Sequence, residues 1–251
     1  MKMEAVLEIA RKAGEKILEI YHNSDLANVV DYKADDSPLT LADKASNDVI
    51  LEGLRQMNTP FPILSEESKH APYEERKNWG TFWLVDPLDG TKEFINRNGE
   101  FTVNIALIEN GTPVFGVIYV PVKDILYVGD ENGAFKQEGS GEMKPIRVNN
   151  STKGRIAVRS KSHASVEEED VLKKYDVTDS ISVGSSLKFC MVAEGKADVY
   201  YRHGPTMEWD TGAGQAIVLA AGGHVYQGIS NNPFTYNKEN LLNGSFLCLG
   251  F

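Results

Sequence analysis

Residues 83–94, WLVDPLDGTKEF, place two carboxylates directly after an apolar run. A buried strand normally excludes unpaired charge, because desolvating an isolated carboxylate is costly. Asp86 and Asp89 nevertheless follow the apolar residues, and Gly90 and Thr91 come next. Charged side chains at the carboxyl end of a strand are typical of ligand sites in α/β folds. The segment therefore predicts a buried strand that delivers acidic groups, a glycine and a hydroxyl to one place.

These residue types suit a divalent cation and a phosphate group. Asp86, Asp89 and a backbone carbonyl between them supply oxygen ligands, which Mg²⁺ prefers. Gly90 and Thr91 offer backbone N–H groups at the start of a possible helix, where a phosphate is well placed. Taken alone, the pattern D-x-x-D-G-T also fits an ordinary turn with Asp89 as a helix N-cap. The rest of the chain has to decide between these two interpretations.

Two more acidic residues lie at the boundaries of predicted elements. Glu66 follows the apolar residues 62–64, and Asp210 opens a segment of small residues that predicts a helix over 211–222. Carboxylates that converge without a cation repel one another strongly. Two or more divalent ions remove this repulsion and can clamp an in-line phosphoryl displacement. We therefore expect a metal-dependent phosphatase site, in which a water flanked by Glu66 and Thr91 is the nucleophile.

The bulk properties of the chain narrow the class of protein. A length of 251 residues allows one large domain or two packed halves. A formal net charge of −10 argues against a nucleic-acid partner. The 2 cysteines lie far apart and provide neither a zinc site nor a disulfide framework. Because every apolar run is shorter than the ~20 residues of a membrane span, we expect a cytoplasmic protein without stable membrane insertion; peripheral association with the inner membrane stays open.

The hydrophobic pattern changes along the chain. Helical spacing marks residues 2–22 and 40–57, and largely antiparallel strands follow, with a hairpin at Asn110-Gly111. Strands and helices alternate in the second half, which includes an expected strand over 181–186. This pattern predicts an α/β protein built in layers. We expect a single phosphatase domain over residues 1–251. Within it we expect two subdomains: residues 1–148, with the antiparallel strands and the metal motifs, and residues 149–251, with α/β structure on the substrate side.

Three segments in a fixed order, ILSEES, WLVDPLDGTKEF and EWDTGAGQAIVLAAGG, resemble the inositol monophosphatase superfamily. Its members are Mg²⁺-dependent, lithium-inhibited phosphatases, and the resemblance covers nearly the whole chain. The segments KEF after the DGT, SKSH at 160–163 and GSSLKFCMVAEGKADVYYRHGPTMEWD are similar to the 3′(2′),5′-bisphosphate nucleotidase branch. The resemblance implies an α+β layered sandwich, with alternating helix and sheet layers, like that of inositol monophosphatase and fructose-1,6-bisphosphatase.

The resemblance also implies a role for each matching residue. Two or three Mg²⁺ ions would be held by carboxylates and one carbonyl, and water activation and phosphate binding would fall to neighbouring groups. Asp43 would stand behind Thr91 and help it to orient the water. The implied metal ligands are Glu66, Asp86, the Leu88 carbonyl, Asp89 and Asp210; the implied catalytic residues are Asp43, Glu66 and Thr91; and the implied substrate contacts are Gly90, Thr91, Ser186, Lys188, Arg202, His163 and Asp210.

The implied reaction removes the 3′-phosphate of 3′-phosphoadenosine 5′-phosphate, or of its sulfated form, in sulfur metabolism. Lys188 and Arg202 favour such a small bisphosphate nucleotide, because a second phosphate in a net-acidic protein needs local cations. One alternative keeps the mechanism and acts on inositol monophosphate or a sugar bisphosphate. Another is a non-catalytic nucleotide- or metal-binding regulator, against which the presence of Thr91 and Asp43 argues. The oligomeric state is left open.

Overall fold

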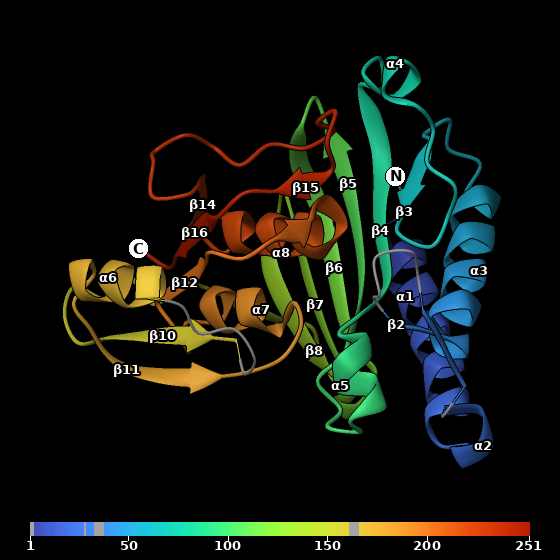
Figure 1. The fold of residues 1–251 in the computed structure, drawn as a ribbon, viewed down its shortest axis with the longest axis horizontal. Coiled ribbons are helices and arrows are strands. Elements are labelled where there is room, and N and C mark those ends of the chain that lie inside the picture. The colour runs from blue at the N-terminus through green and yellow to red at the C-terminus, as the bar shows by residue number, and fades with distance from the viewer. Residues whose placement is uncertain (1–2, 28, 33–37, 161–165) are drawn as a thin grey trace.

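The computed structural model describes residues 3–27, 29–32, 38–160 and 166–251. Within these residues, helices alternate in layers with two extended β-sheets, as Figure 1 shows. One pair of helices covers the outer face of the larger sheet, a second pair lies between the sheets, and a single helix covers the smaller sheet. The layered α/β architecture expected from the sequence is therefore confirmed.

The larger sheet has seven strands within the described residues, in the order β3-β4-β5-β6-β7-β8-β9. Only β3 and β4 pair in parallel, and each later neighbour is antiparallel, as the sequence predicted. Asn110 and Gly111 join two of these strands with φ angles of 49° and 77°, which suits the expected tight hairpin turn. The strands are β3 (Ile63–Ser65), β4 (Thr81–Asp89), β5 (Thr102–Glu109), β6 (Thr112–Val120), β7 (Ile125–Asp130), β8 (Gly133–Glu138) and β9 (Lys144–Ile146).

Side chains that alternate along β4 divide the core between the two faces of this sheet. Trp83 and Val85 pack in the cluster beneath helices α1 (Met3–Tyr21) and α3 (Leu41–Gln56). Phe82 and Leu84 point the other way, into the core between the two sheets. Because successive side chains of a strand face opposite sides, a strand buried on both faces is apolar throughout. That is why β4 shows an uninterrupted apolar run before its first carboxylate.

Helices α7 (Leu187–Ala193) and α8 (Glu208–Ala220) lie between the two sheets. Glycines let α8 approach the larger sheet closely. A Cβ added at Gly116 would lie 2.5 Å from the carbonyl oxygen of Ala213 in α8, and one at Gly129 would lie 2.6 Å from the Cα of Ile217. The small residues of α8 therefore serve close packing, and the helix ties the second half of the chain to the first sheet.

The smaller sheet has the strand order β11-β10-β12-β16-β14 among the described residues. Helix α6 (Val166–Lys174) lies between β10 and β11 in the chain and covers the outer face of this sheet. Its strands are β10 (Arg155–Arg159), β11 (Val177–Ser182), β12 (Val199–Arg202), β14 (His224–Gln227) and β16 (Phe246–Leu249). The shorter elements are α2 (Ser24–Ala27), β1 (Val30–Tyr32), β2 (Pro38–Thr40), α4 (Tyr73–Arg76), α5 (Thr91–Ile95), η1 (Pro121–Lys123), β13 (Thr206–Met207) and β15 (Leu242–Asn243).

Two boundaries near the expected site differ from the sequence prediction. The strand expected over 181–186 ends at Ser182, because Ser185 adopts a left-handed φ of 44° that a strand does not allow. Helix α8 begins at Glu208 rather than at residue 211. The buried Glu208 carboxylate accepts the backbone N–H groups of Asn237 and Lys238 at 2.7 and 2.9 Å, which fixes the helix start against a neighbouring loop.

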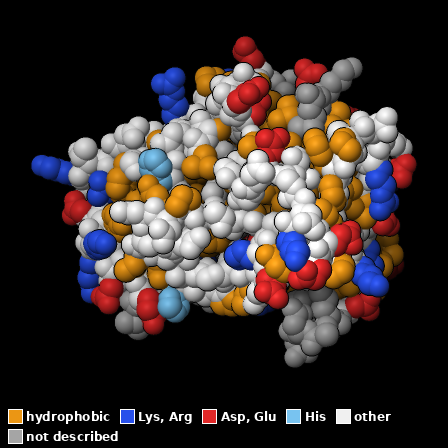
Figure 2. All heavy atoms as spheres, turned by 90° about the horizontal axis from the view of Figure 1, so that it is seen from above, with side chains coloured by type: hydrophobic (Ala, Val, Ile, Leu, Met, Phe, Trp, Pro, Cys, Tyr) orange, Lys and Arg blue, Asp and Glu red, His pale blue; other side chains and the backbone are white. Residues whose placement is uncertain are grey.

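Helix α8, from the second half of the chain, packs on the larger sheet, which belongs to the first half. The division into two subdomains near residue 148 stays a prediction. None of the helices in the described part of the chain is long and apolar enough to cross a lipid bilayer. Figure 2 shows acidic and basic side chains intermingled on the face seen from above, so that this face presents no continuous basic surface. The expected lack of a nucleic-acid partner stays a prediction.

Candidate metal and phosphate site

Strand register brings the first two acidic residues together. β3 and β4 run in parallel with Ser65 paired to Val85, so the next residues, Glu66 and Asp86, lie side by side at the end of the pair. The backbone N–H of Glu66 donates to the Val85 carbonyl at 3.1 Å and holds this arrangement. The strand does not stop at Asp86, as the apolar run had suggested, but continues to Asp89.

A β-bulge lets β4 continue while it changes the direction of its side chains. Asp86 pairs with Asn104 and Asp89 with Thr102, so two residues of β4 face one residue of β5 between these pairs. Pro87, which has no N–H to donate, lies in this bulge. The N–H of Leu88 donates to Asp86 Oδ1 at 3.1 Å. The Leu88 side chain is buried in the core beneath α1 and α3, so only its backbone can serve the site.

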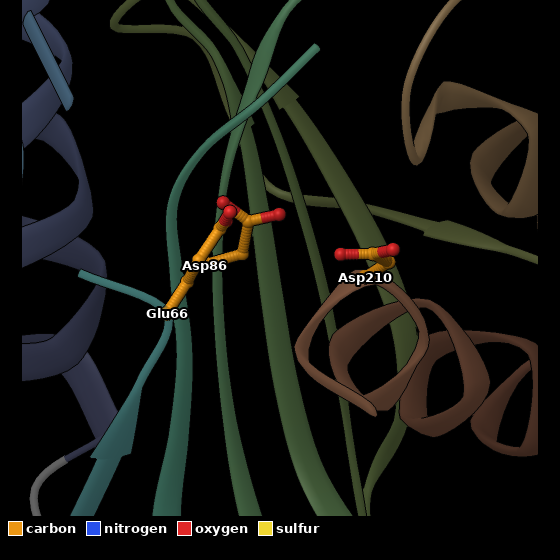
Figure 3. Close-up of side chains that lie close together, drawn as sticks. All are labelled: Glu66, Asp86 and Asp210. Carbon is orange, nitrogen blue, oxygen red and sulfur yellow. The ribbon is translucent and has the colours of Figure 1, made fainter. Parts of the chain in front are cut away.

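The third acidic residue arrives from the other side. Asp210 lies in the first turn of α8, where its Oδ2 accepts the N–H of Met207 at 2.8 Å. Among the described residues, Glu66, Asp86 and Asp210 form a group whose ligand oxygens all lie within 4.8 Å of one another. Figure 3 shows the Asp210 carboxylate directed from the helix toward the two carboxylates of the strands. Asp89 is outside this tight group but lines the adjoining cavity together with Asp210.

The electrostatics of this group fit a divalent cation. Burial raises the pKa of Asp86 well above its usual value, and the charges of Glu66, Asp89 and Asp210 raise it further. Burial likewise raises the pKa of Asp210, with Asp89 and Glu66 adding to the effect. Crowded carboxylates in such surroundings hold protons unless positive charge is supplied. A donor set made only of oxygen atoms is the kind that Mg²⁺ takes, so the residues present fit this ion.

The Thr91 hydroxyl is oriented by a buried carboxylate. Gly90 has a left-handed φ of 91°, which turns the chain from β4 into α5 with Thr91 as the first helical residue. The Thr91 hydroxyl donates to Asp43 Oδ1 at 3.2 Å. Asp43 is held in turn by Thr40, whose N–H and hydroxyl donate to its Oδ2 at 2.7 and 2.6 Å. Since the Thr91 proton points toward Asp43, the lone pairs of the hydroxyl are left to accept from a water.

A cavity of about 160 Å³ joins the acidic residues to basic ones. Its lining includes Asp89 and Asp210 together with Lys188 and Arg202. We call Asp89 and Asp210, with Glu66 and Asp86, the acidic side of the site, and we call Lys188 and Arg202 its basic side. Gly90 also lines it, at the start of α5. The cavity therefore offers places for positive ions and for anionic groups within one space, which is what a molecule with two phosphates requires.

The two basic side chains are held differently. Lys188 is only 7% exposed, and its ammonium donates to the Ser185 carbonyl at 2.6 Å. Burial lowers the pKa of Lys188 to about 8; the charge of Arg202 also lowers it, while Asp89 has the opposite effect. Among the described residues, Arg202 makes only long hydrogen bonds, to the carbonyls of Gly204 and Pro205 at 3.3 and 3.4 Å. These two hydrogen bonds use two of the five N–H donors of the guanidinium group.

Two of the expected substrate contacts need separate comment. His163 lies outside the described residues, although Ser160, at the start of the same SKSH segment, lines the cavity. Ser186 also lines the cavity, but its hydroxyl contacts Asp89 Oδ2 at 2.6 Å and the Asp210 carbonyl at 2.9 Å. The Ser186 hydroxyl, which was expected to contact the substrate, is therefore engaged with two of the proposed metal ligands. The substrate contacts remain predictions in both cases.

Sequence reasoning missed two residues that support the site. Asn104 donates from Nδ2 to the Ser186 hydroxyl at 2.9 Å, and the Thr102 hydroxyl donates to Asn104 Oδ1 at the same distance. Both belong to the segment FTVNIALIE, which otherwise has the composition of a fully buried strand. A polar residue in such a strand is informative, because burial requires it to have a hydrogen-bond partner. That signal was present in the sequence, but the identity of the partner was not.

Comparison with known proteins agrees with this geometry. The sequence is 48% identical to the 3′(2′),5′-bisphosphate nucleotidase CysQ of Salmonella typhimurium over 246 residues, which cover 97% of this chain and 98% of the relative. It is 46% identical to CysQ of Escherichia coli K12 over 245 residues, with the same coverage. The crystal structure of CysQ from Bacteroides thetaiotaomicron superposes with a TM-score of 0.86 at 48% identity and covers 98% of this chain and 96% of that chain.

A more distant structure shows the same fold. The inositol monophosphatase from Anabaena superposes with a TM-score of 0.74 at 26% identity and covers 98% of this chain and 89% of that chain. The sequence pattern of the inositol monophosphatase family matches residues 2–247, which is nearly the entire chain. The acidic group, the Thr91–Asp43 pair and the adjoining cavity thus lie in a protein that belongs to the inositol monophosphatase family.

Proposed function

We propose that the chain is a Mg²⁺-dependent phosphomonoesterase that hydrolyses the 3′-phosphate of 3′-phosphoadenosine 5′-phosphate to give AMP and inorganic phosphate. The sulfated form of this nucleotide is a second substrate of the same type. The observation that carries the proposal is the single cavity that Asp89 and Asp210 share with Lys188 and Arg202. A substrate with one phosphate at the acidic side has a second phosphate within reach of the basic side.

The relatives support the choice of substrate. CysQ proteins of several bacteria match 97% or more of this chain at 35–48% identity and are named 3′(2′),5′-bisphosphate nucleotidases. The matches include the segments that carry the acidic group and the basic pair, since they span nearly the full length. An inositol phosphate bears no nucleoside 5′-phosphate, and it would leave Lys188 and Arg202 without an anionic partner.

In the proposed mechanism, two or three Mg²⁺ ions would be held by Glu66, Asp86, Asp89, Asp210 and the Leu88 carbonyl. When bound, Mg²⁺ supplies Lewis-acid activation of the phosphoryl group and lowers the pKa of coordinated water. The protein's own groups do the rest. Thr91 accepts a hydrogen bond from the attacking water and orients one lone pair of the water oxygen toward phosphorus. Asp43 keeps the Thr91 hydroxyl in the rotamer that this task requires.

The substrate is aligned from both ends of the cavity. The N–H groups at Gly90 and Thr91 contact the scissile phosphate, while Lys188 and Arg202 bind the 5′-phosphate. The water oxygen forms a bond to phosphorus as the bond to the 3′-oxygen breaks. The water gives up one proton and the 3′-oxygen takes up one, so that the products are inorganic phosphate and the free 3′-hydroxyl of AMP. Fixing both phosphates lowers the entropy that must be lost when the reacting atoms align.

The test is phosphate release with Mg²⁺ across a panel of bisphosphate nucleotides, inositol monophosphates and sugar bisphosphates. We expect the highest kcat/KM with 3′-phosphoadenosine 5′-phosphate. A preference for an inositol or sugar phosphate would favour the alternative substrates on the same mechanism. No release from any member of the panel would favour a non-catalytic binding protein. The cytoplasmic location stays a prediction, which cell fractionation can check.

A further inference from the structure

We propose that Ser186 is a positioning residue that fixes the carboxylate of Asp89 for metal binding, rather than a ligand of the substrate. The inference rests on the proposed role of Asp89 as a metal ligand. It concerns a residue that stands between three parts of the fold: Asp89 at the end of β4, the turn before α7, and the first turn of α8.

The contacts of the Ser186 hydroxyl are short and shielded from solvent. The side chain is 2% exposed, and its Oγ lies 2.6 Å from Asp89 Oδ2 and 2.9 Å from the carbonyl oxygen of Asp210. A hydroxyl has a single proton, so it can donate fully to only one of these acceptors. The shorter contact is the one to the side-chain carboxyl of Asp89, and hydroxyl–carboxylate bonds of 2.5–2.7 Å are the stronger kind. The proton of Ser186 is therefore directed to Asp89.

Two buried residues of β5 enforce this direction. The Thr102 hydroxyl donates to Asn104 Oδ1, which leaves the amide group of Asn104 to donate to Ser186 Oγ. If the amide were turned round, its oxygen would take the Ser186 proton, and two oxygens would face each other at 2.6 Å with no proton between them. Thr102 and Asn104 are 0% and 1% exposed, so water does not compete for these groups. The chain of donors runs from Thr102 through Asn104 and Ser186 to Asp89.

The strand register explains why this chain reaches the metal site. Thr102 and Asn104 are the residues of β5 that pair with Asp89 and Asp86 of β4. The polar side chains thus lie directly beside the two acidic positions on the neighbouring strand. Because Oδ2 of Asp89 accepts the proton of Ser186, the carboxylate loses the freedom to rotate and is held in one orientation for a cation. Residues that orient a ligand in this way typically change metal affinity by about 10–100-fold when removed.

The experiment measures Mg²⁺ affinity without substrate, by calorimetry and by competition with Mn²⁺ followed by electron paramagnetic resonance. Ser186→Ala should bind Mg²⁺ about 10–100-fold more weakly than the unmodified protein. The matched control is Ser185→Ala, because the neighbouring Ser185 hydroxyl is buried and has no hydrogen-bond partner among the described residues. That variant should bind Mg²⁺ normally. Melting temperatures of the metal-free proteins show whether each variant is folded.

A second variant tests the direction of the chain without touching the serine. Thr102→Val keeps the shape of the side chain and removes the donor that fixes the Asn104 amide. We expect a smaller loss of Mg²⁺ affinity than for Ser186→Ala. The double variant should bind no more weakly than Ser186→Ala alone, because Thr102 acts only through the serine. Losses that multiply in the double variant would overturn the ordered chain.

The outcomes separate this inference from the proposed function. Unchanged Mg²⁺ affinity in Ser186→Ala, together with a clear loss in Asp89→Asn, would overturn the role of Ser186 and leave the metal site standing. Unchanged affinity in Asp89→Asn would remove the metal ligand itself. A lower melting temperature of metal-free Ser186→Ala with unchanged Mg²⁺ affinity would mark the serine as structural, and the inference would fail.

Discussion

The acidic and basic sides of the site are built in different ways. The acidic side chains sit on regular elements: Glu66 and Asp86 at a parallel strand pair, and Asp210 in the first turn of a long helix. The basic side depends on a turn with a left-handed residue before the short helix that carries Lys188, and on Arg202 at the last position of β12. Regular elements give the acidic group its fixed geometry, while the basic pair depends on how distant turns pack together.

The two sides share one electrostatic property. Burial shifts the pKa of Asp86 and Asp210 upward and the pKa of Lys188 downward, so in each case it favours the neutral form. Cations bound at the acidic side would favour the charged form of its carboxylates, and a phosphate bound at the basic side would favour the charged form of Lys188. Both sides are therefore suited to charged ligands. The acidic side should respond to a change in Mg²⁺, and the basic side to the presence of a second phosphate on the substrate.

The largest effect is expected on the acidic side. Asp89→Asn keeps the size of the side chain and removes one charge, and turnover should fall by more than about 10²-fold because the positioning of metal and nucleophile is lost. The free energy of unfolding should be unchanged or higher, since repulsion among carboxylates is relieved. Steady-state kinetics at several Mg²⁺ concentrations and thermal unfolding measure both. Near-normal turnover at modest Mg²⁺ would exclude Asp89 from the site.

The next effect concerns the hydroxyl between the two sides. Thr91→Val should lower kcat by about 10²-fold, the low end of what general acid–base groups contribute, and leave KM nearly unchanged. Asp43→Asn should act in the same way, because Asp43 works through Thr91. The double variant should then be scarcely slower than either single variant. Multiplicative losses in kcat would show that the two residues act independently.

A smaller effect is expected on the basic side. Arg202→Ala should weaken kcat/KM for the bisphosphate nucleotide by about 1.5–3 kcal/mol, as for the loss of a hydrogen bond to a charged group. A substrate with only the scissile phosphate should be hydrolysed almost as before. The measurement is the ratio of the two efficiencies, with the exposed Arg55→Ala as the control. An unchanged ratio for Arg202→Ala would favour inositol phosphates as substrates.

The smallest expected effect is one of pH. The charged form of Lys188 binds phosphate, and the pKa of Lys188 is lowered to about 8. As the pH rises, Lys188 loses its charge, so kcat/KM for the bisphosphate should begin to fall at about pH 8 or below it. Bound cations near Asp89 oppose the charge that raises this pKa, so they move the fall to lower pH. Lys188→Arg should flatten the profile, since a guanidinium stays charged over this range. A monophosphate substrate, measured in parallel, should show no such fall.

Sequence predicted the acidic side in more detail than the basic side. The layered fold followed from periodicity, because α1, α3 and the strands of the first sheet bury clear apolar faces. The acidic residues were visible as charges at the ends of apolar runs. The bulge after Asp86, the turn at Ser185 and the contact between Ser186 and Asp89 were not, because they arise from pairing between segments far apart in the chain. Local patterns carry no information on such partners.

The position of Asp210 has a consequence for how the protein is made. Glu66 and Asp86 belong to an early part of the chain, and Asp210 follows more than a hundred residues later, on a helix packed between the two sheets. During synthesis, the acidic group can assemble only after that helix has been translated and has docked. Cation binding at this group should therefore stabilise completed chains and leave partial ones unaffected, since a ligand stabilises only the state that binds it.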